Sequence, residues 1–256
     1  MPKINGFVFY RGPSMLDGAP IVAILTGLNK GSRNTKTGAG ILQTWILRSD
    51  VSPIKAIHSG ADSSICGNCQ HRGTLQKVRG RLRNSARSCY VTVFQAPTVV
   101  HKAYRRGNVY PQVSPQTASE LVENRMVRLG SYGDPAAVPI YVWEIMLARV
   151  SGKAGYSHQW RTFPELAAYC MASCDTAAEQ LQAKILGWRT FRVRNPSDPI
   201  LSREIVCPAS KEAGHKTSCD TCKACGGNTA KAKADVVIMA HGAIGKINAF
   251  AARLAA

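Results

Sequence analysis

Short apolar runs separated by polar, glycine-bearing segments dominate the first 119 residues. The runs at 7–10, 20–26, 44–48 and 89–94 are apolar or β-branched, and most are bounded by Gly, Pro, Asn or Ser. Runs of this length and composition are typical of β-strands. The pattern therefore predicts a β-rich part over residues 1–119, with a polar, glycine-rich loop at 27–40.

From residue 120 onward, strand-like runs alternate with helical patterns. Strands are expected over 126–133, 169–175, 190–193 and 234–242, and helices over 138–150, 163–168, 176–187 and 243–255. Strands that alternate with helices imply a parallel sheet with crossover helices. The predicted fold class is therefore α/β, either a compact or partial β/α barrel or an open sheet. Residues 1–119 and 120–256 are expected to form one continuous domain.

Polar residues follow several of these expected strands. Ligands of parallel α/β sheets bind at the carboxyl ends of the strands, so these residues should meet at one rim. The candidate catalytic residues are Asp134, His158, Gln159 and Asp175. An aspartate would act as nucleophile or general base, and His158 as proton donor or orienting group. As alternatives, Asp175 could simply cap the next helix, and His158 could be a structural histidine.

The chain is strongly basic, with a formal charge of +18 and a pI near 9.8. No Asp or Glu occurs from Ser63 to Ser119, a span with nine Lys or Arg. A block of one charge sign repels itself unless an anion neutralises it, and nucleic-acid phosphate is a common partner. We expect binding of nucleic acid, DNA rather than RNA, at Arg33, Lys36, Arg72, Lys77, Arg79, Arg81, Arg83, Arg87, Arg105 and Arg106. The alternative is a solvated basic loop.

Two groups of cysteines have the spacing of metal ligands. The first is Cys66, Cys69 and Cys89, and the second is Cys207, Cys219, Cys222 and Cys225, with His241 as an alternative fourth ligand. Cysteines two residues apart can turn both sulfurs toward one metal, which predicts zinc or an iron–sulfur cluster. The basic run between Cys69 and Cys89 would then be a loop closed by the metal. Cys170 and Cys174 fall on one face of an expected strand and are interpreted as buried structural thiols.

The cysteine count also bears on the compartment. An odd number of cysteines, nine, and an N-terminus without the pattern of a secretory signal favour free thiols or metal ligands in a cytosolic protein. No apolar run of about 18 residues suggests a membrane span.

Motifs along nearly the whole chain resemble a family of phage and prophage proteins of the kind labelled phage gene product 88. These motifs are FYRGPSMLDGAPIVAI, SRNTKTG, ICGNCQHR, CYV, VRLGSYGDPAAVP, GYSHQW, GWRTFRV and the ending CPAS, CDTCKAC and HG. The resemblance implies a cytoplasmic protein of a phage-infected or prophage-bearing bacterium, and no particular activity.

Two enzyme families share parts of the pattern. Cys219, Cys222, Cys225 and His241 resemble the late zinc site of phage DNA-guanine and tRNA-guanine transglycosylases, which implies a barrel and base exchange with Asp134 or Asp175 as nucleophile. The first cysteine group resembles the three cysteines of radical-SAM enzymes, which are partial barrels. That resemblance implies an iron–sulfur cluster, S-adenosylmethionine, and an auxiliary cluster at the late cysteines.

The sequence thus predicts a metal-containing phage-type enzyme that modifies a base in nucleic acid, by transglycosylase-like exchange or by iron–sulfur radical chemistry. One alternative is a non-enzymatic, zinc-stabilised DNA- or RNA-binding protein. Another is a phage protein that inhibits a host enzyme through its basic surface.

Overall fold

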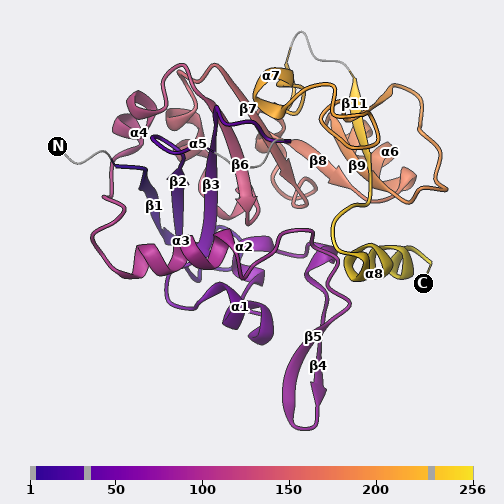
Figure 1. The fold of residues 1–256 in the computed structure, drawn as a ribbon, viewed down its shortest axis with the longest axis horizontal. Helices are drawn as coiled ribbons and strands as arrows, with labels where there is room; N and C mark the ends of the chain where they lie inside the picture. The colour runs from indigo at the N-terminus through magenta and orange to yellow at the C-terminus, as the bar shows by residue number, and fades with distance from the viewer. Residues whose placement is uncertain (1–3, 32–35, 230–233, 256) are drawn as a thin grey trace.

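The fold is built on one large sheet. The structure, a computed structural model, describes residues 4–31, 36–229 and 234–255. Its nine-stranded sheet has the order β1-β2-β3-β6-β7-β8-β9-β11-β10 (Figure 1). In that order the strands are β1 (Gly6–Pro13), β2 (Pro20–Thr26), β3 (Ile41–Arg48), β6 (Met126–Tyr132), β7 (Gly152–Ser157), β8 (Met171–Cys174), β9 (Thr190–Arg194), β11 (Asp235–Met239) and β10 (Glu204–Val206).

The sheet is antiparallel on one side and parallel on the other. β1, β2 and β3 pair antiparallel, whereas every pair from β3–β6 onward is parallel. The α/β prediction is therefore confirmed. Closure into a barrel is not seen, because β1 and β10 stand at opposite ends of the strand order and no described pairing joins them. The β3–β6 pairing joins the β-rich first part and the β/α second part in one sheet.

Short helices connect the strands. They are α1 (Pro53–Ser59), α2 (Ser63–Cys66), α3 (Ala96–Arg105), α4 (Pro115–Leu121), α5 (Ile140–Met146), α6 (Ala177–Ile185), α7 (Cys219–Cys222) and α8 (Ile244–Leu254), with single 3₁₀ turns η1 (Gln70–Arg72), η2 (Pro135–Ala137) and η3 (Pro164–Ala168). α6 begins as its sequence predicts. The Thr176 hydroxyl accepts from the Glu179 amide at 3.1 Å, and the Glu179 carboxylate accepts from the Asp175 amide at 2.8 Å.

The core forms where the sheet is covered. β2 is buried from Ile21 to Leu25, and Trp143 and Trp160 are the largest fully buried side chains. Burial of such apolar surface is the main favourable term in folding. The edge of the sheet that ends at β10 also contains a buried ion pair. Arg192 of β9 pairs with Glu204 of β10 at 2.7 Å, and both side chains are buried.

Residues 70–95 differ from the sequence prediction. The expected strand at 89–94 is wrong: this segment has no regular strand, because Ser88 and Cys89 turn into the wall of a cavity and such contacts override β-propensity. The basic run before it is not a loop. It forms a separate hairpin of β4 (Thr74–Val78) and β5 (Arg81–Ser85), which projects away from the rest of the protein beyond α1 and α8 (Figure 1).

Within the described ranges, none of the helices has the length and apolar character that a membrane crossing requires.

Candidate functional site

Both cysteine groups line one cavity of about 190 Å³ on a face of the parallel sheet. The first group stands at the carboxyl ends of β3 and β6, where Asp134 and His158 also line the wall. The second group stands toward the opposite ends of the strands. There the backbone amide of Cys219 donates a hydrogen bond to the carbonyl of Lys36, just before β3. The cavity therefore runs along the strands from one cysteine group to the other.

The first group is shaped by a tight turn. Cys66 ends α2, and Gly67 follows with a φ of +58°. A Cβ on Gly67 would lie 2.5 Å from the side-chain Cδ of Gln159, so only glycine fits. The Gln159 amide in turn donates to the Cys66 carbonyl at 3.1 Å. Cys89 is brought in by a backbone hydrogen bond from its amide to the His71 carbonyl, 3.0 Å long.

The three thiols of this group are close enough to influence one another. Burial raises the pKa of Cys66, and the neighbouring Cys69 and Cys89 add to the rise. Burial likewise raises the pKa of Cys69 to about 12 and raises that of Cys89. Without a metal all three are protonated at neutral pH. Metal binding must therefore displace protons, as it does at thiolate sites generally.

A buried ion-pair cluster holds this loop in place. Asp62 is fully buried, and its carboxylate accepts from Arg72 at 2.7 Å and from Arg87 at 3.3 Å. Arg72 also donates to the carbonyls of Gly60 and Gly67. These two arginines were expected to contact nucleic acid. In the structure both pair with Asp62 and support the cysteine loop, where one carboxylate balances one of the two positive charges.

The second group draws on three pieces of chain. Cys207 follows β10, Cys219 and Cys222 bound the single turn α7, and Cys225 comes just after it. Burial raises the pKa of Cys225 to about 12, and the thiols of the other three add to the rise. The Tyr156 hydroxyl is hydrogen-bonded to Cys225, and the Cys225 carbonyl accepts from the Gly155 amide at 3.0 Å. The four cysteines therefore form one set.

Cationic side chains surround this set. Arg128 and Lys36 line the cavity and lower the pKa of Cys219, against the larger effect of burial. Arg128 donates to the Tyr90 hydroxyl, but it forms no ion pair with a carboxylate of the described residues, and its buried Nε has no partner. Such a cation is best neutralised by an anion in the cavity, as bound thiolates would be.

His241 lines the same cavity, but its ring nitrogens contact groups other than the four cysteines. Its Nδ1 lies 3.0 Å from the Met239 carbonyl, and its Nε2 lies 3.3 Å from Lys36 Nζ. Burial, and then the charge of Lys36, lowers its pKa. Of the two predicted fourth ligands, Cys207 is the one that stands with the other three thiols.

The sulfur atoms within each group are spread apart. Among the described residues, which include all nine cysteines, no three cysteine sulfurs lie within 4.8 Å of one another. In a tetrahedral zinc site, with Zn–S near 2.3 Å, the sulfurs lie about 3.8 Å apart. Binding of a single zinc ion would therefore draw the sulfurs of either group together, whereas in a [4Fe–4S] cluster each cysteine binds a different iron and the sulfurs stand farther apart.

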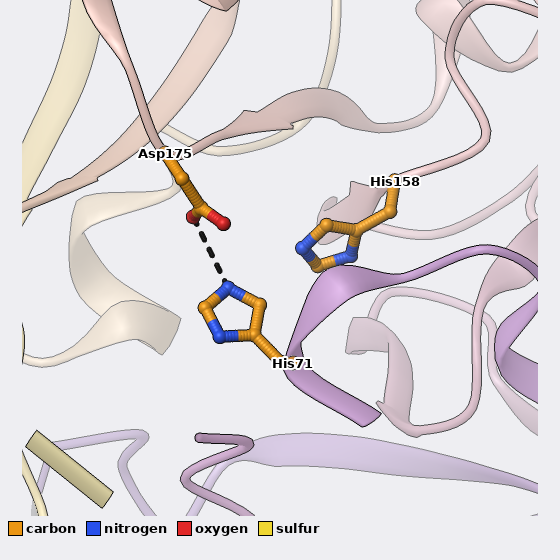
Figure 2. A group of neighbouring side chains, drawn as sticks. All are labelled: His71, His158 and Asp175. Carbon is orange, nitrogen blue, oxygen red and sulfur yellow. Dashed lines mark hydrogen bonds and ion pairs between the residues drawn. The ribbon is translucent and has the colours of Figure 1, made fainter. Parts of the chain in front are cut away.

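A third group of ligand-type side chains adjoins the first cysteines. Figure 2 shows His71, His158 and Asp175 pointing toward one another, and ligand atoms from all three lie within 4.8 Å. They form one candidate His2Asp metal site. However, the Asp175 carboxylate also accepts from Arg253 of α8 at 2.6 Å. A guanidinium so close opposes the binding of a cation at this carboxylate.

The same three residues are arranged for proton transfer. His71 Nε2 lies 3.1 Å from Asp175 Oδ1, and its Nδ1 lies 2.8 Å from Ser88 Oγ. Because an ionised carboxylate only accepts, the neutral His71 ring donates from Nε2 and accepts from Ser88. Phe250 of α8 stacks on the ring at 5.7 Å. His71 faces the cavity with Asp175 behind it, whereas His158 Nε2 is buried and has no partner.

Asp134 and Gln159 lie where the sequence predicts but have orienting contacts. The Asp134 carboxylate accepts from the Ala136 amide at 3.0 Å, the Ser157 hydroxyl at 2.8 Å and the His158 amide at 2.7 Å. Burial raises its pKa despite these donors. A carboxylate so engaged ties the end of β6 to the end of β7 and is poorly suited to attack a substrate.

Replacing Asp175 with asparagine is expected to lower the free energy of unfolding at neutral pH by about 2 kcal/mol. Burial opposes ionisation of Asp175, but the hydrogen bond and charge of His71, together with Arg253, hold its pKa at about 2. Since the pKa is depressed, this stabilisation is present above about pH 4 and is lost as the pH falls toward 2.

Urea unfolding of the wild type and of Asp175→Asn at a series of pH values tests this. The difference between them should be constant from pH 7 to about 4 and shrink below it. Asp50→Asn is the control, because Asp50 pairs with Arg48 at the surface. A difference that grows on acidification would contradict the assignment.

The remaining residues predicted to bind nucleic acid lie in four different places. Arg33 lies outside the described residues. Lys36 lines the cavity beside the second cysteine group, while Arg105 and Arg106 are exposed at the end of α3. Lys77, Arg79, Arg81 and Arg83 lie on the β4–β5 hairpin.

Sequence reasoning did not assign roles to His71, Ser88, Arg128 or the side chains of α8. His71 could have been found, because it follows Cys69 by two residues and therefore shares its loop. Phe250 and Arg253 could not, because only the fold brings α8 over the first cysteine group.

In comparisons with family models, with curated proteins and with solved structures, no match to this chain was found.

Proposed function

We propose that this protein is an iron–sulfur enzyme that modifies a base in DNA. The observation that carries the proposal is the convergence of a three-cysteine group and a four-cysteine group on one cavity. Four cysteines satisfy a [4Fe–4S] cluster completely, whereas three leave one iron open to a further ligand. An open position beside a cavity is what a catalytic metal centre needs, in contrast to a closed structural one.

The residues present fit two clusters. Arg128 supplies a positive charge beside Cys219 without a carboxylate partner among the described residues. Tyr156 adds a hydrogen bond to Cys225. Charges and hydrogen bonds next to the sulfurs tune the reduction potential of such clusters. Cys66, Cys69 and Cys89 would hold the first cluster, and Cys207, Cys219, Cys222 and Cys225 the second.

The position of the three cysteines supports radical-SAM chemistry. They follow β3, the first strand of the parallel part, and β6, β7, β8 and β9 then lie side by side in sequence order. Such an order is what a partial β/α barrel would show, with its open cluster at the end of an early strand. Cys66, Cys69 and Cys89 would hold a cluster there, whose chemistry would be one-electron reduction of S-adenosylmethionine once an external reductant had reduced it.

The other residues of the cavity would handle the substrate. Asp175 fixes the tautomer of the His71 ring, and His71 could exchange a proton at Nδ1 through the Ser88 hydroxyl, which also lines the cavity. His158 lines the same cavity, and its buried Nε2 has no hydrogen-bond partner among the described residues. Because the cavity lies against the sheet, the base must leave the helical stack to reach it.

Base exchange by an aspartate nucleophile is less well supported. Asp134 is saturated by three donors, and Asp175 is paired with His71 and Arg253. A closed zinc protein would explain the four-cysteine group but not a group of three cysteines that lines a cavity.

The proposal is tested by purifying the protein without oxygen, adding dithionite as reductant and S-adenosylmethionine, and measuring methionine and 5′-deoxyadenosine. We expect reductive cleavage that depends on Cys66. Nucleoside analysis of DNA included in the same reaction then reports the modified base. No cleavage by protein that carries its full iron content would contradict the proposed chemistry.

A further inference from the structure

The β4–β5 hairpin pairs only with itself. It forms a separate two-stranded sheet, with five cross-strand residue pairs from Thr74↔Ser85 to Val78↔Arg81. Every residue of β4 is exposed, including the apolar Leu75 and Val78, and Leu82 of β5 is 54% exposed. An isolated hairpin is marginally stable in water. A projecting ribbon with apolar side chains on its surface therefore points to a partner that covers it.

The ribbon is positively charged throughout. Lys77, Arg79, Arg81 and Arg83 fall within seven residues, in a part of the chain with no acidic residue between Ser63 and Ser119. Lys77, Arg79 and Arg83 are exposed, and none of them forms an ion pair with a described residue. In this they differ from Arg72 and Arg87 at the foot of the hairpin, which both pair with Asp62. The partner should therefore be an anion along the ribbon itself.

The turn keeps the ribbon narrow and carries charge at its tip. Arg79 and Gly80 form a two-residue connection and have φ values of +48° and +76°. Positive φ at both central positions is the pattern of a type I′ turn, which matches the twist of a hairpin. A non-glycine residue there adopts a disfavoured conformation. The backbone of the arginine at the tip of the hairpin is therefore somewhat strained.

The foot of the hairpin is fixed to the wall of the cavity. Asn84 donates to the Ile57 carbonyl of α1 at 3.2 Å. The residues on either side, His71 before the hairpin and Ser88 and Cys89 after it, line the cavity. The foot of the ribbon therefore lies next to the first cysteine group.

We propose that the β4–β5 hairpin enters the major groove of duplex DNA and delivers the duplex to the cavity. Strands of five residues span about 17 Å, and the major groove of B-DNA, about 12 Å wide, admits a two-stranded ribbon. The basic side chains contact phosphates and base edges, and exposed Leu82 and Val78 meet apolar groups such as the thymine methyl. The major groove of A-form RNA is too narrow for this mode, and a single strand has no groove.

This inference rests on the proposed function only for the chemistry that follows binding. Binding itself is tested with a DNA duplex of about 30 base pairs over a range of salt concentrations. The hairpin variant is Arg79→Asn, Arg81→Gln and Arg83→Gln. Asn-Gly favours the type I′ turn, so the hairpin is retained. The matched control removes the same charge from three exposed lysines outside the predicted binding set, by Lys102→Gln, Lys211→Gln and Lys216→Gln.

The hairpin variant should bind duplex DNA about tenfold more weakly or worse, with the slope of log K against log salt reduced by about 2–3. The control should retain most of the wild-type affinity and slope. An equal loss in both variants would show nonspecific attraction and overturn the proposal. So would wild-type binding of single-stranded DNA or duplex RNA of the same sequence as tightly as duplex DNA.

Iron content and cleavage of S-adenosylmethionine without DNA are measured on the same samples. The hairpin variant should match the wild type in both, because it leaves the cavity intact. If the wild type lacks iron but binds duplex DNA through the hairpin, the proposed function fails and this inference stands. If the clusters are present but removal of the hairpin charge does not weaken DNA binding, this inference fails and the proposed function stands.

Discussion

Replacing Cys66 with alanine is expected to halve the iron content, from about eight to about four per chain, because each [4Fe–4S] cluster holds four irons. Cleavage of S-adenosylmethionine should fall to background, since the lost cluster is the one with an open iron. Cys66 ends α2, and Cys69 and Cys89 stand beside it at the carboxyl edge of the sheet. Two remaining thiols are too few to hold that cluster.

Cys222→Ala is the informative counterpart. It should also remove about four irons, but S-adenosylmethionine should still bind, because the first group is intact. Cys170→Ala is the matched control: Cys170 is as deeply buried as any cysteine but belongs to neither group, so iron and cleavage should be unchanged. Equal loss of S-adenosylmethionine binding in Cys66→Ala and Cys222→Ala would contradict the division of roles between the two cysteine groups.

Replacing Asp62 with alanine should lower the free energy of unfolding by about 3–5 kcal/mol, the effect of breaking a buried ion pair from one side. Asp62 is 0% exposed, and its loss leaves Arg72 and Arg87, at 21% and 15% exposure, without their counter-ion. Both arginines border the loop of the first cysteine group. The first cluster should therefore be lost together with the stability.

Denaturant unfolding and iron analysis measure these effects. Asp50→Ala is the control, because Asp50 pairs with Arg48 at the surface with 47% of its side chain exposed. Removal of a pair of that kind changes stability by about 1 kcal/mol or less. A similarly small change for Asp62→Ala, with full iron content, would show that the cluster of Asp62, Arg72 and Arg87 does not support the site.

The sequence anticipates those parts of the fold in which local pattern and tertiary environment agree. β2, β6, β9 and β11 are apolar runs that become buried strands, and α6 has its own capping residues. β7 was not recognised because its sequence, GKAGYS, has only one large apolar side chain. The segment at 89–94 has strand-like residues but serves as cavity wall, a choice that local propensity cannot show.

The site could be predicted in part. The cysteine spacing predicts two groups of candidate ligands, and the strand-end rule brings Asp134, His158 and Asp175 to one rim. The cysteine spacing and the strand-end rule do not show that the two groups share a cavity. That depends on the backbone hydrogen bond from Cys219 to the segment before β3. Nor does charge alone separate Arg72 and Arg87, which support the fold, from the exposed cations of the hairpin. That distinction depends on Asp62, ten residues before Arg72.

The most direct test of the central claim is to count iron, acid-labile sulfide and zinc in protein purified without oxygen. Two clusters on one cavity predict about eight irons and about eight sulfides per chain, with little zinc. One or two zinc ions per chain, with neither iron nor sulfide, would contradict the account and leave both cysteine groups as structural metal sites.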